Sequence, residues 1–325
     1  MNNSSTELIF YDYKNPVNAA AACSMFLIGS FGLICNSLMV YVFFREKSER
    51  TSFNLICLFR SSANIYILLT TFFGDFIPAT LIGYSLYDPE IETWMIGITN
   101  SIYVVNEYIT IIVAVNRFNA LFFPFFYTKL FGFKTTLIYL LLIYIFRGGL
   151  LIQELVEYPK GCYYLYFIDI LAWSTSEDEK CQQSHNFFIM FTLCSLLGIS
   201  VLNLSTFLKI IMFYKSGHSQ DLTSRRKIKS NIKLFFQTLL QDSLFLIDLT
   251  STYKLNGLST NRVWTFICGS QIWQCLHSFD GFIMIMFNER FLIIKNSLFS
   301  SPSVSKVTRV SGSCHITKTV LPTVQ

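Results

Sequence analysis

Acidic side chains and a histidine lie within long apolar stretches of this 325-residue chain, among them Glu107, Asp242, Asp248, His277 and Asp280. His277 and Asp280 are three positions apart, so they share one face of a helix. An ionisable group at the middle of a membrane costs several kcal/mol unless it is paired. Each of these groups is therefore a candidate to bind a polar ligand, to exchange partners when helices move, or to line an ion path.

Depth in the membrane separates the ligand candidates from the others. Glu107 lies 13 residues into its apolar stretch, about 20 Å from the start at 1.5 Å per residue. Asp248 is closer than Asp242 to the outer rim, and Gln274 lies about one turn outside His277. We predict ligand contacts at Glu107, Asp248 and Gln274, with His277 and Asp242 as further candidates. The alternative is a structural network of hydrogen-bonded amides and neutral acids. We favour that alternative for three residues: Asp242, Asp280 and Asn64.

The same residues argue against an enzyme. No two of the four histidines have metal-ligand spacing, and the chain contains neither a Gly-x-Ser-x-Gly elbow nor a glycine-rich phosphate loop. The last apolar stretch, 264 to 287, contains no lysine that could form a Schiff base with retinal. We therefore expect no catalytic residue, no metal site and no cofactor.

The composition predicts an all-α membrane protein that would position these groups. The chain is 52% hydrophobic and 14% charged, against about 25% charged residues in a soluble domain. Seven apolar segments are long enough to cross a bilayer at about 20 residues each. They are Val17 to Phe44, Phe53 to Ile82, Trp94 to Phe118, Thr135 to Val156, Asn186 to Tyr214, Asn231 to Leu255 and Trp264 to Phe287.

The distribution of lysine and arginine predicts the orientation of this seven-transmembrane helix bundle. One set of loops with the carboxyl-terminal tail carries 18 of these residues, and the other set with the amino terminus carries 5. Because basic residues concentrate on the cytoplasmic side, the amino terminus is expected outside. Asn2 and Asn3 each head an Asn-x-Ser sequon, so we predict glycosylation there. The net charge of +5 is not gathered on one polar domain, which argues against nucleic-acid binding.

We expect three regions along the chain: an extracellular amino terminus over residues 1–16, a receptor domain over 17–291 and a cytoplasmic end over 292–325. Apolar residues from Phe287 to Leu298 recur at helical spacing, which predicts a short amphipathic helix on the inner leaflet. The serine- and threonine-rich stretch after it is expected to be disordered. The basic stretch Ser224 to Lys229 fits either anionic lipid or a partner protein.

Two cysteines form the expected disulfide pair. Cys162 and Cys181 lie 19 positions apart in the longest outer loop, whereas six other cysteines lie in apolar runs. On the oxidising side of a membrane, closing such a loop is worth about 3 kcal/mol in the chain-entropy account.

The third apolar segment ends on Asn116-Arg117-Phe118, and Arg117 could be only an interfacial anchor. Together with other motifs, however, the triplet resembles nematode serpentine chemoreceptors of class X, which are rhodopsin-like seven-transmembrane G protein-coupled receptors. The further motifs that carry this resemblance are Gly32-x-x-x-Asn36, Ser62-Ala-Asn64, Phe122-Phe-Pro124, Cys162 with Trp173 and Cys181, Asn203-x-x-Thr206, Gln241-Asp242 and His277-x-x-Asp280-Gly281.

The resemblance implies roles for particular residues. In the rhodopsin-like class the matching positions couple to the G protein or switch during activation; here they are Asn36, Asn64, Asn116, Arg117, Phe118 and Asp280. The chain departs from the class in several places, and the fourth segment, for example, lacks the usual tryptophan. Asn64 replaces the sodium-binding aspartate, the sixth segment lacks the proline that would kink it, and the third segment lacks the outer cysteine.

The functional hypothesis is therefore a chemosensory receptor in the plasma membrane. It would bind a small molecule in the outer half of the bundle and activate a heterotrimeric G protein. The family resemblance implies that the receptor is located in a sensory cilium. The alternative is a membrane channel or transporter that uses the buried acids as an ion path. The sequence has no internal repeat of the kind that many transporters contain.

Overall fold

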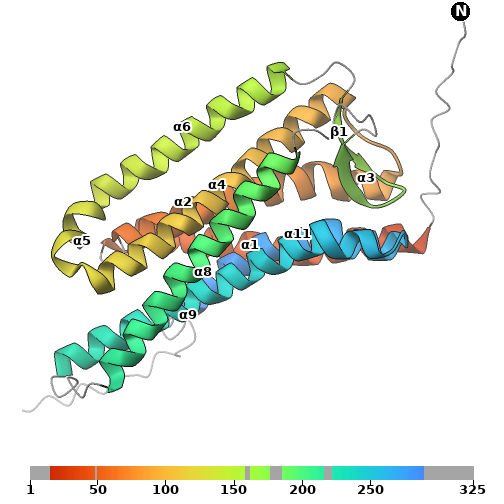
Figure 1. Ribbon diagram of the computed structural model, residues 1–325. Helices are drawn as coiled ribbons and strands as arrows, with labels where there is room; N and C mark the ends of the chain where they lie inside the picture. Colours follow the sequence, from red (N-terminus) through yellow and green to blue (C-terminus); the bar gives the residue numbers. More distant parts are fainter. Residues whose placement is uncertain (1–14, 48–49, 158–161, 176–184, 216–221, 289–325) are drawn as a thin grey trace, which may run out of the picture.

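The computed structural model describes residues 15–47, 50–157, 162–175, 185–215 and 222–288. Over these residues seven helical passes run side by side (Figure 1). The first four are α1 (Pro16–Arg45); α2 (Ser52–Ile67), which continues through η2 (Leu68–Phe76) into α3 (Ile77–Ile82); α4 (Pro89–Phe122); and α6 (Phe133–Glu157). The last three are α8 (His185–Lys215); α9 (Leu222–Thr250) with η3 (Ser251–Leu255); and α10 (Arg262–Thr265), η5 (Phe266–Gln271) and α11 (Ile272–Phe287). Each pass covers one predicted segment, and the ends differ by a few residues except at α4 and α9, which begin earlier.

Local capping residues set several of these ends. The side chain of Asn15 accepts a hydrogen bond from the backbone N–H of Val17 at 2.9 Å, and Pro16 occupies the first position of α1. Thr51 caps α2 in the same way. Gly83, with φ of 87°, ends α3 in the left-handed conformation that glycine adopts without strain.

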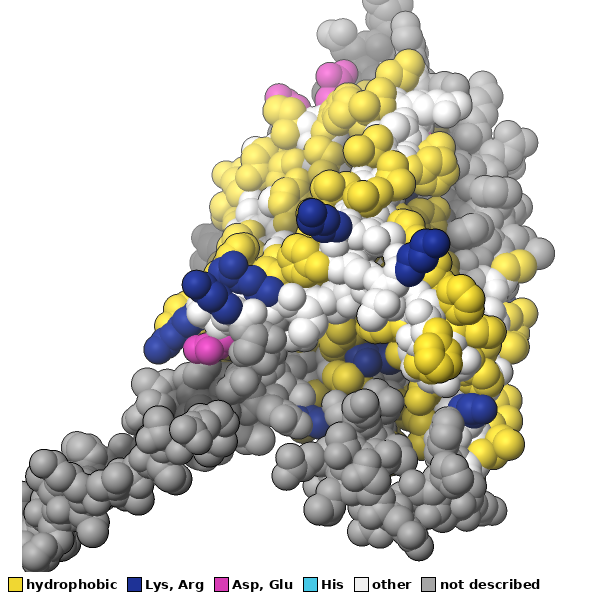
Figure 2. Space-filling view, turned by 90° about the vertical axis from the view of Figure 1, so that its left-hand side faces the viewer, with side chains coloured by type: hydrophobic (Ala, Val, Ile, Leu, Met, Phe, Trp, Pro, Cys, Tyr) yellow, Lys and Arg dark blue, Asp and Glu magenta, His cyan; other side chains and the backbone are white. Residues whose placement is uncertain are grey.

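The bundle presents an apolar outer surface. Five described helical passes are long and apolar enough to cross a membrane. The other two predicted spans are α9, which begins with basic residues, and the last pass, where η5 interrupts the α-helix. On α6, Ile145 is 70% exposed, as expected of a side chain that faces lipid. Figure 2 views the molecule from the end that carries the short helix α5 (Pro124–Leu130); hydrophobic side chains cover the flank, and lysine and arginine side chains gather near this end.

The π-helical stretch η2 was not predicted, and it ends two residues before Pro78. Pro78 has no N–H, so the carbonyl of Gly74 four positions earlier receives no bond from it. The hydroxyl of Tyr87 donates to that carbonyl instead, at 3.1 Å. The sixth pass contains no proline; it remains α-helical to Thr250 and then becomes π-helical over η3.

A two-stranded hairpin covers the end of the bundle opposite α5 (Figure 1), although the sequence predicted only helices. Strands β1 (Tyr164–Phe167) and β2 (Ala172–Thr175) pair antiparallel, with Tyr166 opposite Trp173. The ring of Tyr166 stacks on Phe76 with centroids 4.1 Å apart, and its hydroxyl is 2.8 Å from that of Thr80. The hairpin therefore closes the bundle over the second pass.

Several predicted features lie outside the described residues. They are the glycosylation sites Asn2 and Asn3, the region 1–14, Cys181, and the amphipathic helix and tail beyond Asn288. Cys162 is buried directly before β1 and is not among the free cysteines of the described chain. Its pairing with Cys181 stays a prediction.

Candidate functional site

The centre of the bundle contains an ion pair between α2 and α11. Arg60 donates from one terminal nitrogen to Asp280 Oδ1 at 2.8 Å and from Nε to Asp280 Oδ2 at 3.3 Å. Its other terminal nitrogen donates to the hydroxyl of Thr110 on α4 at 3.1 Å. Arg60 is 5% exposed and Asp280 is 2% exposed. Such a pair offsets the cost of burying two charges only when further hydrogen bonds hold them.

Amide side chains supply those further bonds. Asn64 donates to Asp280 Oδ2 at 2.8 Å and to the side-chain oxygen of Asn36 at 3.2 Å. The oxygen of Asn64 accepts from Asn106 at 3.2 Å and lies 2.9 Å from Nδ1 of His277. The predicted switch residues Asn36, Asn64 and Asp280 are thus brought together, and the network joins α1, α2, α4 and α11.

Gln241 connects α9 to the same carboxylate. Its amide nitrogen donates to Asp280 Oδ1 at 2.7 Å. Asp280 therefore accepts bonds from helices in the second and sixth passes at once. Any displacement of α9 relative to α11 must break or remake this bond.

The predicted ligand candidates divide into different surroundings. Asp248 accepts from the hydroxyl of Tyr103 at 2.8 Å, and Glu107 accepts from Thr192 at 3.1 Å. Asp242 accepts from Asn203 on α8 at 2.6 Å. Gln274 instead faces α1, where it donates to the backbone oxygen of Met25 at 2.7 Å. The structure thus places the side chain of Gln274 in the packing of α11 against α1.

Aromatic rings pack around Tyr103, the hydrogen-bond donor to Asp248. Tyr103 stacks on Phe245 with centroids 5.3 Å apart, and Trp273 lies 6.5 Å from Tyr103 and 5.9 Å from the His277 ring. The small cavity beside these rings has a volume of about 10 Å³. That is room for about one water molecule.

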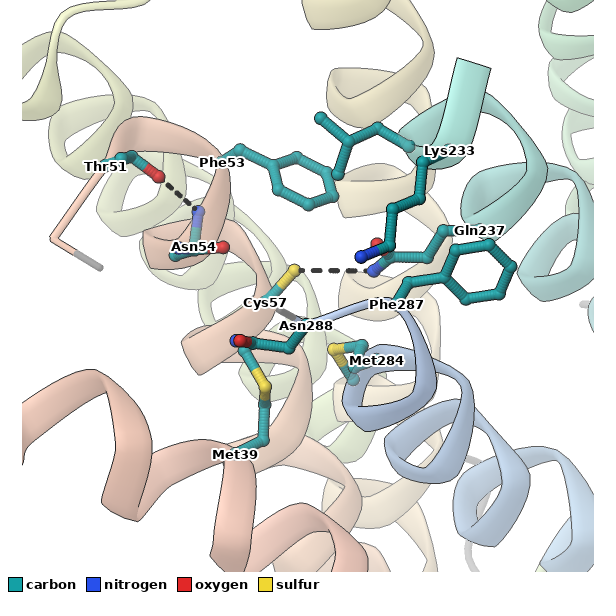
Figure 3. Close-up of a pocket in the computed structure, with 11 residues that line it drawn as sticks. Met39, Thr51, Phe53, Asn54, Cys57, Lys233, Gln237, Met284, Phe287 and Asn288 are labelled. Carbon is teal, nitrogen blue, oxygen red and sulfur yellow. Dashed lines mark hydrogen bonds between the residues drawn. The ribbon is translucent and has the colours of Figure 1, made fainter. Parts of the chain in front are cut away.

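A second, larger cavity opens at the other end of the bundle. It has a volume of about 210 Å³ and is lined by residues of α1, α2, α9 and α11. Figure 3 shows Lys233 and Gln237 from α9 facing Phe53 and Cys57 from α2 across this space. Among the described residues, no group of three or more histidine, cysteine or acidic side chains could hold a metal ion.

The Asn116-Arg117-Phe118 triplet lies near this inner cavity. The guanidinium of Arg117 lies 3.8 Å from the ring centroid of Phe53, which lines the cavity. Its Nε and one terminal nitrogen have no hydrogen-bond partner in the described structure. Asn116 accepts from the hydroxyl of Tyr127 at 3.5 Å, and Phe118 stacks on Phe122.

Arg60, the cation at the centre of the network, was not among the predicted site residues. Its signal was a single arginine inside an apolar run, one helical turn before Asn64. Its partner Asp280 is 220 positions away, so the sequence alone did not identify the pair.

Comparisons with known proteins agree with this architecture. The family described as "Serpentine type 7TM GPCR chemoreceptor Srx" matches residues 26–288. The relative "Serpentine receptor class X 45" of Caenorhabditis elegans is 20% identical over 297 residues, which cover 85% of this chain and 80% of the relative. The crystal structure of squid rhodopsin matches with a TM-score of 0.68 at 13% identity, over 87% of this chain and 81% of that one.

Proposed function

Because the chain belongs to the Srx family of serpentine seven-transmembrane chemoreceptors, we propose that it binds a small molecule in the outer half of the bundle and activates a heterotrimeric G protein. The observation that carries the proposal is the shared acceptor Asp280, bonded at once to Arg60, Asn64 and Gln241. Receptors of this kind need an element with two arrangements that both a ligand and a partner protein can bias. The bond between α9 and α11 is such an element.

The proposed signal runs from the outer acids to the inner cavity. A ligand that contacts Asp248 displaces α9, which also carries Gln241 and, further inward, Gln237 and Lys233. The Gln241–Asp280 bond then rearranges, and the cavity beside Phe53 changes shape. A partner protein that enters this cavity meets the guanidinium of Arg117. Two nitrogens of that group have no hydrogen-bond partner in the described structure and can donate to the partner protein.

Replacement of Arg117 tests this proposal. In cells that express the full chain, Arg117→Ala should abolish most of the basal and stimulated calcium or cyclic-nucleotide signal at normal surface level. Arg45→Ala is the matched control, because Arg45 is an arginine at the end of α1 that is exposed and bonds to Tyr41. Normal signalling by Arg117→Ala would reduce Arg117 to an interfacial anchor and overturn the coupling role.

A further inference from the structure

Acids of this bundle differ in whether they have a counter-cation. Asp280 is 2.8 Å from Arg60, and Glu154 is 2.8 Å from Arg147. Glu107 and Asp248 have no such partner among the described residues, although they are 0% and 2% exposed. Retaining a buried acid without a cation opposes stability, because the charged form is poorly solvated.

Glu107 and Asp248 also face the same region. The hydroxyl of Tyr103 donates to Asp248, and Tyr103 lies four positions before Glu107, on the same face of α4. Each holds one oxygen in a hydrogen bond and leaves the other, Glu107 Oε1 or Asp248 Oδ1, without a partner in the described structure. Two carboxylates on α4 and α9 therefore offer one vacant acceptor each.

A third vacant acceptor lies on α11. Nδ1 of His277 is 2.9 Å from the side-chain oxygen of Asn64, so a neutral imidazole donates there and presents Nε2 as an acceptor. Nε2 is buried and has no partner in the described structure. All three vacant atoms can accept hydrogen bonds, and two of them belong to carboxyl groups.

We propose that the ligand is a cation, a protonated or quaternary amine held between Glu107 and Asp248. This inference rests on the proposed receptor function. An ammonium group supplies both the missing positive charge and, when protonated, hydrogen-bond donors for the vacant oxygens. The rings of Tyr103, Phe245 and Trp273 add faces that attract a cation.

Another acid without a partner, Asp75, fits this role less well. Both of its oxygens lack partners in the described structure, but its acidic neighbour Glu92 is already occupied. One oxygen of Glu92 accepts from Ser85 at 2.6 Å, and the other accepts from the backbone N–H of Tyr166. Glu107 and Asp248 are thus the pair in which both carboxylates are open.

Binding at this site requires movement, because the small cavity nearby is lined by Tyr103, Phe245 and His277 but not by Glu107 or Asp248. The cavity next to Tyr103 and His277, of about 10 Å³, is too small for an amine with a carbon skeleton. The ligand must therefore displace Phe245 or Tyr103, which pack between α9 and α4. Charge attraction at Asp248 then moves the helix that carries Gln241.

The test uses the purified full chain in lipid nanodiscs at neutral pH. Four probes are compared. Phenethylamine and its trimethylammonium analogue are the cationic probes, and phenethyl alcohol and phenylacetate are the neutral and anionic control compounds. Both amines should raise the Tm of the protein by about 2 °C or more at saturating concentration, and the neutral and anionic control compounds should raise it by less. Glu107→Gln and Asp248→Asn should abolish the amine shift, while the control Glu154→Gln keeps it. Equal shifts with all four probes, or no shift with either amine, would overturn the cation assignment.

A measurement without ligand separates this role from a structural one. Glu107→Gln and Asp248→Asn should leave Tm unchanged or raise it, because each removes an uncompensated acid. Asp280→Asn should lower Tm, because it strands the charge of Arg60. A lower Tm in all three variants would show that Glu107 and Asp248 have a structural role and would overturn the proposal. Arg117→Ala should keep the amine shift, so failure of G-protein coupling is distinguishable from failure of ligand assignment.

Discussion

At the scale of single residues, the pair Arg60–Asp280 should be costly to break and cheaper to replace. Arg60→Met leaves a buried carboxylate without its cation, a loss of about 3–5 kcal/mol. The double variant Arg60→Met/Asp280→Leu removes both charges and should recover much of that loss. Thermal unfolding of the detergent-purified chain measures both effects.

Arg147 is the matched control for this prediction. Its partner Glu154 has a side chain that is 49% exposed, so water can solvate the carboxylate that Arg147→Met leaves behind. Arg147→Met should therefore lower Tm less than Arg60→Met does. Equal losses, or a double variant that is no more stable than Arg60→Met, would contradict the role of the central pair.

Asn116 controls the resting state of Arg117 in the second prediction at this scale. Neutral hydrogen bonds are worth about 1 kcal/mol, whereas charge-assisted ones reach about 3 kcal/mol. The structure gives Arg117 a ring contact with Phe53 and no ion pair within the described residues. Asn116→Asp supplies an acid beside the guanidinium and should lower basal signalling severalfold at equal surface level. Unchanged or higher basal signalling would refute a weakly restrained resting state.

At the scale of helices and strands, apolar periodicity and length predicted the passes, because a membrane span must be long and apolar. The departures have local causes that periodicity does not contain. The π-helical stretch before Pro78 was not predicted, and the hydroxyl that donates to the Gly74 carbonyl comes from Tyr87 in the following loop. The hairpin was missed because its stabilising contacts, such as Tyr166 with Phe76 and Thr80, come from distant segments.

Tyr87→Phe tests the account of the π-helical stretch. The substitution keeps the ring but leaves the carbonyl of Gly74 without its donor, which should cost about 1 kcal/mol. Tm should fall by a few degrees, while the homologous change Tyr41→Phe, at an exposed site on α1, should change it less. Equal Tm for Tyr87→Phe and the unmodified chain would show that water or another group satisfies the carbonyl.

At the scale of the whole molecule, the sequence predicted a receptor bundle and several members of its central network, but not how they connect. Asn36, Asn64 and Asp280 were chosen by resemblance, and their contact follows from how α1, α2 and α11 pack. The close approach of α1 and α11 depends on Gly281, where a Cβ atom would lie 2.6 Å from the Asn36 side chain. Such three-dimensional proximity does not follow from the positions of residues along the chain.

The orientation of the bundle provides the last prediction. An odd number of spans places the two termini on opposite sides of the membrane, and the 18 to 5 distribution of basic residues favours an amino terminus outside. Lysine and arginine side chains gather near the end that carries α5 (Figure 2), which fits a cytoplasmic location for that end. An antibody should therefore reach a tag before Pro16 on intact cells, and a tag after Ser313 only after permeabilisation. If both tags were accessible on intact cells, the number of spans would be even and the seven-span topology would be wrong; the reverse pattern would place Arg117 outside and exclude its coupling to a G protein.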